Sequence, residues 1–252
     1  NMADNRESAL LEARLSDAVD IAERRGRPHF VGFLDEREAA FAKTLMNRLR
    51  FERFLLWGGH EEAERVMFGA FPFYSEPEAA SFPFQPLTIL YRKGDSLGHR
   101  DFLGGLLSRG VQRESIGDIL VEEGRAVVFV RDEVASFLVD QTAKIGKVGV
   151  RISAGAQLPY PAAHRFEPLS LVVASARLDC LVAALAGMSR EKAVSCVSAG
   201  LVTLNHQEET SPSCRVEEGS KLSVRGKGKF IIDRLGPLTK KGRLCVSGRK
   251  YI

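Results

Sequence analysis

The sequence predicts a multidomain α+β fold: an α/β region over residues 1–85, a ferredoxin-like βαββαβ domain over 86–170 and an αα-β domain over 171–252. Apolar residues recur every three or four positions in several segments, which is the spacing of a buried helix face. The middle third contains strand, helix, strand, strand, helix and strand patterns, in the order of a ferredoxin-like domain. Charge also divides the chain, because the net value is −4 over 1–85, +1 over 86–170 and +7 over 171–252.

The N-terminal region combines helices with short extended runs. A helix is expected over 9–25, ending at Gly26. Asp35 starts a second helix, with Glu38 three residues later in the arrangement of a capping box. The acidic net charge makes this region a poor binder of phosphate. The other expected elements are extended runs at 30–34 and 54–57, a helix at 61–68 and a linker at 71–86.

The middle third supplies the ferredoxin-like pattern. The helix over 132–143 is expected to turn Val134, Phe137 and Leu138 inward. RNA-recognition modules use this fold, and so do many enzymes and metal carriers. Residues 125–130 contain Phe129 as their only aromatic residue, so the aromatic RNA-stacking signature is missing and RNA binding through this sheet face is unsupported. The expected strands are 87–91, 116–121, 125–130 and 147–152, and the expected helices are 100–108 and 132–143.

Two short helices are expected near the start of the C-terminal third. Ser175 is the expected N-cap of the first helix, which ends at Gly187. Ser189 caps the second helix, which ends at Gly200. The other expected elements are short strands at 201–204 and 221–225 and a terminal hairpin at 243–252 that turns at Ser247-Gly248.

Long cationic side chains remain once the apolar faces of these helices are assigned. Arg177 and Arg190 occupy the helix starts, off the apolar faces, and Lys192 follows within the second helix. Helix starts are also expected to offer free backbone N–H groups, which together with such cations suit a phosphate oxygen. Further cations alternate with glycines or form a basic loop, and all of them together predict a polyanion partner. These further cations are Arg225, Lys227, Lys229, Lys240, Lys241 and Arg243.

Other classes of site find little support in the sequence. The four cysteines show neither zinc spacing nor a small disulfide framework, so reduced thiols in a cytoplasmic protein are expected. The five histidines lack metal-ligand spacing, and Gly226-Lys227-Gly228 lies between strands, where a nucleotide site does not form. No run reaches membrane-spanning length and no signal segment is recognised. We therefore expect a monomer without cofactor, metal, catalytic residues, small-molecule substrate or membrane partner.

The C-terminal pattern resembles the S-four RNA-binding domain, named after a small-subunit ribosomal protein. The resemblance is carried by Arg177-Leu178-Asp179, by Ser189-Arg190-x-x-Ala193 and by Gly200-Leu201-Val202-x-Leu204-Asn205. It implies that Arg177, Ser189, Arg190 and Lys192 face RNA and that Asp179 braces the fold. His206 stands where that family usually has glycine, which leaves the turn after Leu204 open. The candidate RNA-binding residues are Arg177, Ser189, Arg190, Lys192, Asn205, Arg225, Lys227, Lys229, Lys240, Lys241 and Arg243.

Over essentially its full length the chain resembles the YlmH family of bacterial and plastid proteins. The resemblance implies a cytoplasmic RNA-binding protein that contacts rRNA or tRNA on the large ribosomal subunit, with a role in ribosome-associated quality control. It rests on these segments: Phe33-Leu34-Asp35, Gly58-Gly59 with Ala63-Glu64-Arg65, His99-Arg100-Asp101-Phe102-Leu103-Gly104, Gly117-Asp118-Ile119-Leu120-Val121, Arg225-Gly226-x-Gly228 and Thr239-Lys240-Lys241-Gly242-Arg243.

Two other functions stay open at the level of sequence. The first is an RNA-modifying enzyme related to pseudouridine synthases, whose catalytic aspartate also lies in an Arg-Leu-Asp context. Asp179 lies at a helix start inside the binding domain, and only a short tail follows, so a bracing role is favoured. The second is a ribosome-associated adaptor linked to cell division or photosystem assembly, for which RNA is incidental.

Overall fold

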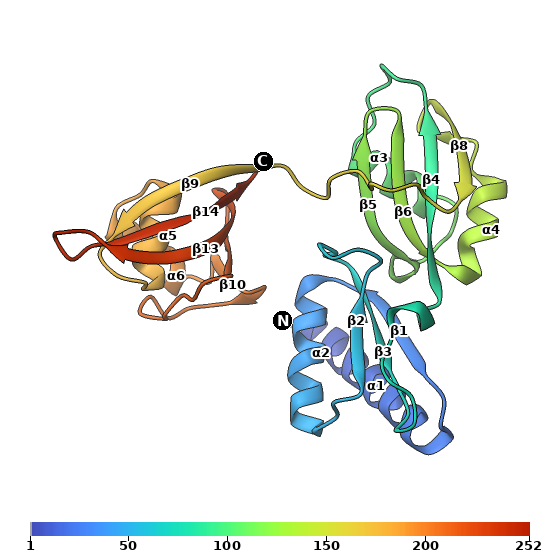
Figure 1. Ribbon diagram of the computed structural model, residues 1–252, viewed down its shortest axis with the longest axis horizontal. Coiled ribbons are helices and arrows are strands. Elements are labelled where there is room, and N and C mark those ends of the chain that lie inside the picture. The colour runs from blue at the N-terminus through green and yellow to red at the C-terminus, as the bar shows by residue number, and fades with distance from the viewer. Residues whose placement is uncertain (1) are drawn as a thin grey trace. The chain divides into compact units, whose positions relative to one another are not determined.

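The computed structural model describes the backbone of residues 2–252 and the side chains of 6–252. It combines helices with antiparallel sheets, and it divides into two compact units (Figure 1). The N-terminal unit is Asn1–Ala163 and the C-terminal unit is His164–Ile252. Within the described residues, no helix combines the length and apolar character needed to cross a membrane.

The first layer of the N-terminal unit is a three-stranded antiparallel sheet in the order β1-β3-β2. Two helices cover one of its faces, and the core between them includes Leu15, Leu45, Met46 and Phe68. The Asp35–Glu38 capping box forms as predicted. The elements of this layer are α1 (Met2–Arg25), β1 (His29–Leu34), α2 (Glu36–Leu49), β2 (Phe54–Trp57) and β3 (Val66–Ala70).

The predicted helix at 61–68 is wrong, because the chain turns there and then enters β3. β3 is the middle strand of its sheet, paired on both sides. Its neighbouring residues Met67 and Phe68 are both fully buried, Phe68 against the helices and Met67 on the opposite face. A strand places consecutive side chains on opposite faces. Burial of Met67 and Phe68 on opposite faces therefore requires a strand, although the local sequence pattern favours a helix.

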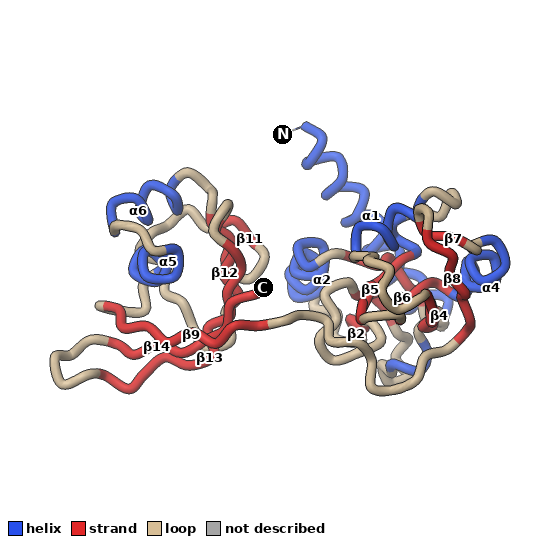
Figure 2. Tube along the Cα trace, turned by 90° about the horizontal axis from the view of Figure 1, so that it is seen from above, coloured by secondary structure: helices blue, strands red, loops and turns tan. Residues whose placement is uncertain are grey.

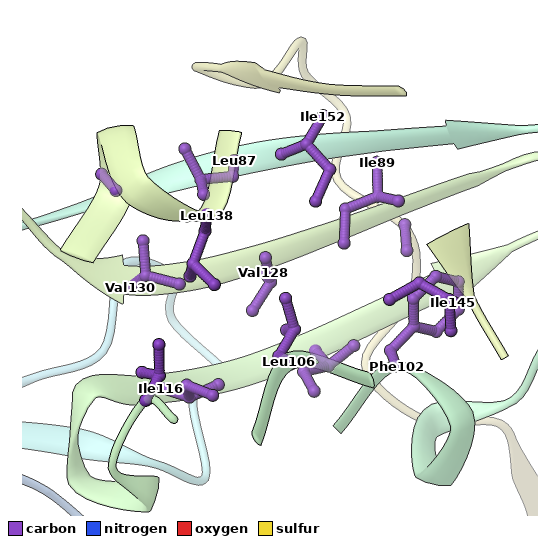
Figure 3. Packing of buried hydrophobic residues seen from close by; sticks show 14 residues of the cluster. Leu87, Ile89, Phe102, Leu106, Ile116, Val128, Val130, Leu138, Ile145 and Ile152 are labelled. Carbon is purple, nitrogen blue, oxygen red and sulfur yellow. The ribbon is translucent and has the colours of Figure 1, made fainter. Parts of the chain in front are cut away.

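The second layer is a sheet in the order β5-β6-β4-β8-β7, and its elements follow the predicted order with one added short strand. Helices α3 and α4 cover one face, where Leu87, Phe102, Val128 and Leu138 pack together (Figure 3). The inward placement of Phe137 is wrong, because 44% of that residue is exposed. The elements are β4 (Phe84–Tyr91), α3 (His99–Leu107), η2 (Arg113–Ser115), β5 (Ile116–Glu122), β6 (Arg125–Arg131), α4 (Asp132–Gln141), β7 (Lys144–Ile145) and β8 (Val148–Ala154).

The two layers share an aromatic core. The face of β5 and β6 that is turned away from α3 and α4 buries Leu120, Val127 and Phe129 against residues of the first layer. Phe71 and Phe82 belong to the same cluster, and the short 3-10 helix η1 (Ala79–Ser81) lies between them in sequence. The predicted linker at 71–86 is therefore wrong, because its aromatic side chains supply core and its end forms β4.

The C-terminal unit is built on a sheet in the order β11-β10-β12-β13-β14-β9. Both of its helices lie on one side of the sheet (Figure 2). The predicted boundary after residue 170 falls inside β9, which pairs along its whole length with β14. The elements are β9 (Phe166–Val173), α5 (Leu178–Ala186), α6 (Arg190–Ser198), β10 (Val202–Leu204), β11 (Gln207–Glu208), β12 (Lys221–Val224), β13 (Gly228–Leu238) and β14 (Leu244–Tyr251).

The predicted terminal hairpin is wrong, because β14 runs unbroken through Ser247-Gly248 between β13 and β9. Gly248 is needed for close approach and not for a turn. A Cβ atom on Gly248 would lie 2.2 Å from the carbonyl oxygen of Ile231. Glycine inside a strand often marks such a close approach of two backbones.

Gly248→Ala is expected to lower the free energy of unfolding of the C-terminal unit by about 2 kcal/mol, because β13 and β14 must separate locally. Urea unfolding followed by circular dichroism measures the change. Gly149→Ala is the control, since a Cβ there meets nothing within 4 Å. Equal stability of the two variants would contradict the close approach of β13 and β14.

Candidate nucleic-acid interface

Helix α5 begins differently from the prediction. Its N-cap is Arg177, whose side chain makes no capping bond, and Ser175 lies outside the helix with its hydroxyl 3.6 Å from the Cys180 sulfur. The first N–H groups are satisfied by backbone, because Leu178 N donates to Cys214 O at 2.8 Å and Asp179 N donates to Pro212 O at 3.0 Å. The expectation of free amides at this helix start is therefore wrong.

Helix α6 begins as predicted. Gly187 ends α5 in the left-handed conformation, with φ 60°, which a glycine adopts at little cost. Ser189 then caps α6, and its hydroxyl accepts a hydrogen bond from Lys192 N at 3.3 Å. Ala193 and Val197 are fully buried and fix the helix on the core. Arg190 and Lys192 consequently stand on the exposed side of the first turn.

Asp179 is the centre of the arrangement. Of the residues from 6 to 252, it is the only charged one that is buried, and its side chain is 2% exposed. Arg177 donates to it from Nε at 3.1 Å and Nη2 at 3.0 Å, and Arg190 donates from Nε at 3.3 Å and Nη2 at 3.2 Å. Its Oδ1 also accepts from Cys180 N at 2.9 Å. The two helix starts are thereby held together by one carboxylate.

The electrostatics of Asp179 follow from these contacts. Hydrogen bonds from Arg177, followed by those from Arg190, lower the pKa of the carboxyl from 3.8 to about 2 against the opposing effect of burial. The same bond raises the pKa of Arg177. The group of three therefore carries one negative and two positive charges at neutral pH, and its excess charge is positive.

The expectation that Arg177 and Arg190 offer their cations to a phosphate is corrected in part by this geometry. Each guanidinium turns its Nε and Nη2 donors inward to Asp179, so that edge is not presented to a phosphate. The side chains are still 43% and 55% exposed, and a guanidinium has five N–H donors, of which the carboxylate uses two. The remaining donors can reach an external anion from a fixed position.

A further cation, Arg215, lies beside this group, and no sequence pattern indicated it. Arg215 forms an isolated antiparallel bridge with Arg177, and the bridge brings together residues that are far apart in the chain. The side chain of Arg215 is exposed. Because the pairing depends on the 212–216 segment crossing the start of α5, no local pattern could have found it.

Asn205 lies in a turn that explains it structurally. Asn205 and His206 have φ values of 49° and 68° and join β10 to β11 through a two-residue hairpin turn. The Asn205 side-chain oxygen accepts from Lys221 N at 3.0 Å, and Asn205 N donates to Lys221 O at 2.8 Å. The turn after Leu204 therefore forms with histidine in the place of glycine.

Asn205→Ala is expected to lower the free energy of unfolding of the C-terminal unit by about 1 kcal/mol, because alanine loses the side-chain bond and tolerates positive φ poorly. Thermal unfolding measures it. Asn205→Gly is the control and should recover part of the loss. A variant that unfolds like the wild type would show that the side-chain bond contributes nothing.

The other predicted cations fall into two places. Arg225, Lys227 and Lys229 lie at or beside the β12–β13 turn, and Lys240, Lys241 and Arg243 lie at the β13–β14 loop. The eleven residues of β13 separate the two by about 36 Å at about 3.3 Å per residue. Figure 2 shows the β13–β14 loop extending beyond the helices. These six cations therefore form two separate basic regions and not one continuous patch.

The β13–β14 loop contacts the strand that leads to the arginine pair. Leu244 pairs with Val173, and the chain needs only four residues to pass from Val173 to Arg177, a reach of at most about 14 Å. Arg243 Nη2 also donates to Val172 O at 3.1 Å, which ties the loop to β9. The C-terminal unit as a whole carries 15 Lys/Arg and 8 Asp/Glu.

A second polar cluster joins the two layers of the N-terminal unit. The Asp118 carboxylate accepts from Glu64 N and Arg65 N, each at 2.9 Å, and lies 2.8 Å from His60 Nε2. The Arg65 guanidinium donates to the carbonyl oxygens of Phe33, Ile116 and Arg113 at 3.0 to 3.1 Å. Burial, followed by the charge of Arg65, lowers the pKa of Arg113 to about 10. The cluster occupies the joint between the layers.

Several segments that carry the family resemblance meet at this joint. A Cβ atom on Gly58 would lie 2.4 Å from Arg65 O, one on Gly59 would lie 2.3 Å from the Phe129 ring, and one on Gly117 would lie 2.7 Å from the Phe33 ring. Glycine is required at Gly59 and Gly117 because the two layers approach closely there, and at Gly58 because the β2–β3 connection folds back against its own backbone. These segments therefore have a structural explanation.

Known proteins are similar to the chain over most of its length. Residues 77–157 match the family model described as "Putative RNA-binding domain in YlmH". The chain is 32% identical over 234 residues to "Ribosome-associated protein quality control protein P2" of Bacillus subtilis (strain 168), covering 90% of this chain and 89% of that protein. The solved structure "Cell division protein ylmH from Streptococcus pneumoniae" matches with a TM-score of 0.51 at 22% identity, covering 61% of this chain and 92% of that chain. The structural likeness concerns the fold alone.

Proposed function

Because the chain belongs to the YlmH family, we propose that it is a non-catalytic RNA-binding protein that acts on the ribosome and binds structured rRNA or tRNA. The observation that carries the proposal is the 32% identity to a ribosome-associated quality-control protein along 90% of this chain. The family model for an RNA-binding domain over 77–157 supports it independently. In this proposal the protein serves ribosome-associated quality control on the large subunit, as a cytoplasmic monomer.

The C-terminal unit is the proposed S-four-type RNA-binding domain. Its two short helices place Arg177 and Arg190 side by side, and Asp179 fixes both guanidiniums before any RNA arrives. Fixed donors lose less side-chain entropy on binding than mobile ones, which favours affinity for a folded RNA of matching shape. Lys192, Arg215 and the loop containing Lys240 and Lys241 add phosphate contacts around this pair.

The middle sheet is the proposed ferredoxin-like domain. Its strand order β5-β6-β4-β8, with both helices on one face, supports that assignment. It differs from an RNA-recognition module in one respect that matters for function. Leu120, Val127 and Phe129, on the face where such modules stack bases, are buried against the first layer. RNA therefore has to reach this domain elsewhere.

A role in binding and not in catalysis is supported by the state of Asp179. A pseudouridine-synthase-like aspartate would need access to its substrate, whereas this carboxylate is 2% exposed and held by two guanidiniums. Mass analysis of nucleosides in RNA from a deletion strain tests this point. We expect every modified nucleoside of the parent strain to be present, and the loss of one would favour an enzyme.

Crosslinking in cells tests the binding function itself. Protein crosslinked by ultraviolet light is purified under denaturing conditions, and the attached RNA is sequenced. The expected result is enrichment of rRNA or tRNA in discrete stretches, together with sedimentation of the protein with ribosomal particles. Recovery of partner proteins that survives nuclease treatment, without RNA enrichment, would instead favour an adaptor linked to cell division or photosystem assembly.

A further inference from the structure

One part of the middle sheet is not covered by the first layer: the face of β4 and β8 around Leu90. Leu87 and Ile89 on β4 face the helices, so Thr88 and Leu90 face the other side. On β5 and β6 that other side is buried under the first layer. Leu90 instead is 44% exposed, between Arg125 of β6 and Arg151 of β8, its direct cross-strand partners. The sheet thus leaves one apolar residue open between two arginines.

These two arginines are not equivalent. The guanidinium of Arg125 is already engaged within the protein, because it pairs with Glu122 and donates to the carbonyl oxygens of Gln157 at 3.0 Å and Pro159 at 2.8 Å. Those bonds hold the segment after β8, which contains Gln157 and Pro159, against β6. Arg151 is exposed and faces outward on the same side as Leu90. Arg151 is therefore the guanidinium of this pair that is placed to meet a ligand.

Further exposed cations surround this position. Arg92 and Lys93 follow the last residue of β4, and Lys144 and Lys147 belong to β7 and to the β7–β8 turn, which pairs beside them. Asp95 and Glu123 are the acidic residues in the adjoining turns, Glu122 is paired with Arg125, and Asp140 lies on α4 on the other face. We call the exposed set the β4–β8 surface: Leu90, Arg92, Lys93, Lys144, Lys147 and Arg151.

The β4–β8 surface borders a hollow, which Leu90 and Arg151 help to line. An open depression of about 480 Å³ is lined by Leu90, Tyr91, Ala143, Gly149, Val150 and Arg151. A Cβ atom on Gly149 would meet nothing within 4 Å, so the space over that residue, two positions from Arg151, is open. A ligand backbone can approach the sheet there without displacing a side chain.

We propose that the β4–β8 surface is a second RNA contact that binds the phosphodiester backbone. The proposal rests on the proposed RNA-binding function and assigns the surface through which the middle domain serves it. Arg151 lines the open depression, and four more exposed cations lie on the adjoining strand ends and turns, a cluster of charge that complements a polyanion. No exposed aromatic side chain belongs to this set, and bases are read mainly by aromatic stacking and by polar contacts to base edges. The contact is therefore independent of sequence and sensitive to salt.

The test compares two charge reversals of equal size in the full chain. K147E/R151E alters the β4–β8 surface, and R37E/K43E alters two exposed cations on α2 in the same unit. Affinity for labelled fragments of deproteinised ribosomal RNA is measured against salt concentration. We expect K147E/R151E to bind roughly fivefold or more weakly, with a log–log salt slope that is shallower by about 1 to 2. The control should stay within about twofold of the wild type.

Circular dichroism confirms that both variants are folded, and the outcomes separate the two proposals. If K147E/R151E binds the RNA like the control, the surface assignment is overturned while the proposed function stands. If it loses affinity only for poly-L-glutamate, used as an acidic polypeptide probe, the surface binds protein and the assignment is likewise overturned. If the wild-type chain does not bind the RNA, the proposed function itself fails, and the surface assignment fails with it.

Discussion

Asp179→Ala is expected to lower the free energy of unfolding of the C-terminal unit by about 3 kcal/mol, because two guanidiniums lose their shared buried carboxylate. The bonds from Arg177 and Arg190, together with that from Cys180 N, are lost at once. Removal of one member of a buried charge cluster costs more than removal of an exposed pair, since the remaining like charges repel. Arg177 and Arg190 are partly exposed, which keeps the effect below that of a fully buried pair.

The effect of Asp179 depends on pH with a definite sign. Its pKa is lowered in the folded state, from 3.8 to about 2, so the folded state is favoured wherever the carboxyl is ionised. The contribution is complete above pH of about 4 and is lost as pH falls from about 4 to about 2. The stability difference between wild type and Asp179→Asn should therefore shrink over that interval.

Spectroscopy can assign the loss to the correct unit. Trp57 is the only tryptophan, and it packs in the aromatic core of the N-terminal unit. Asp179→Ala should shift the urea transition seen by circular dichroism and leave the Trp57 fluorescence transition in place. The matched control is Asp233→Ala, which removes an exposed pair with Arg249 and should cost about 0.5 kcal/mol. Equal losses of unfolding free energy in the two variants would show that Asp179 stabilises the unit no more than an exposed ion pair does.

Arg65→Met is expected to lower the free energy of unfolding of the N-terminal unit by about 3 kcal/mol. Three carbonyl oxygens, of Phe33, Ile116 and Arg113, lose a charged donor, although Arg113 continues to donate to Ile116 O at 2.8 Å. Each bond from a charged donor contributes about 1.5 to 3 kcal/mol, and partial exposure of the guanidinium reduces the sum. Methionine preserves much of the aliphatic stem, so the loss of unfolding free energy measures the contribution of the guanidinium group.

The Trp57 fluorescence transition measures the effect of Arg65→Met directly, because Trp57 lies in the core beside this joint. Arg37→Met, on the exposed side of α2, is the control and should change stability by at most about 0.5 kcal/mol. An unshifted Trp57 transition in Arg65→Met would mean that the aromatic core alone holds the two layers together.

The features that local chemistry specifies could be predicted from the sequence. The Asp35–Glu38 capping box, the Ser189 cap and the Gly187 stop each depend on residues within one turn, and all three form. The element order of the middle sheet follows from alternating and helical spacing, which is local as well. The charge of the C-terminal unit needs no structure at all.

The features that depend on distant partners could not be predicted. The 61–68 segment reads as a helix until β1 and β2 pair on both sides of β3. Ser247-Gly248 reads as a turn until Ile231 O is found against Gly248. In the candidate interface, the bonds from Arg177 to Asp179 are local, whereas the arrival of Arg190 at Asp179 and the bridge to Arg215 depend on how separate segments pack. Tertiary packing decided each of these nonlocal features.

The salt dependence of RNA binding by the R177Q/R190Q variant tests whether the two arginines held by Asp179 bind RNA. The full chain is titrated with labelled ribosomal RNA fragments at a temperature where circular dichroism shows it folded. R234Q/K250Q, which removes two exposed cations from the same unit, is the control. We expect R177Q/R190Q to bind roughly tenfold more weakly, with a slope shallower by about 2, while the control changes little. A folded R177Q/R190Q protein with wild-type affinity and slope would show that Arg177 and Arg190 do not bind RNA.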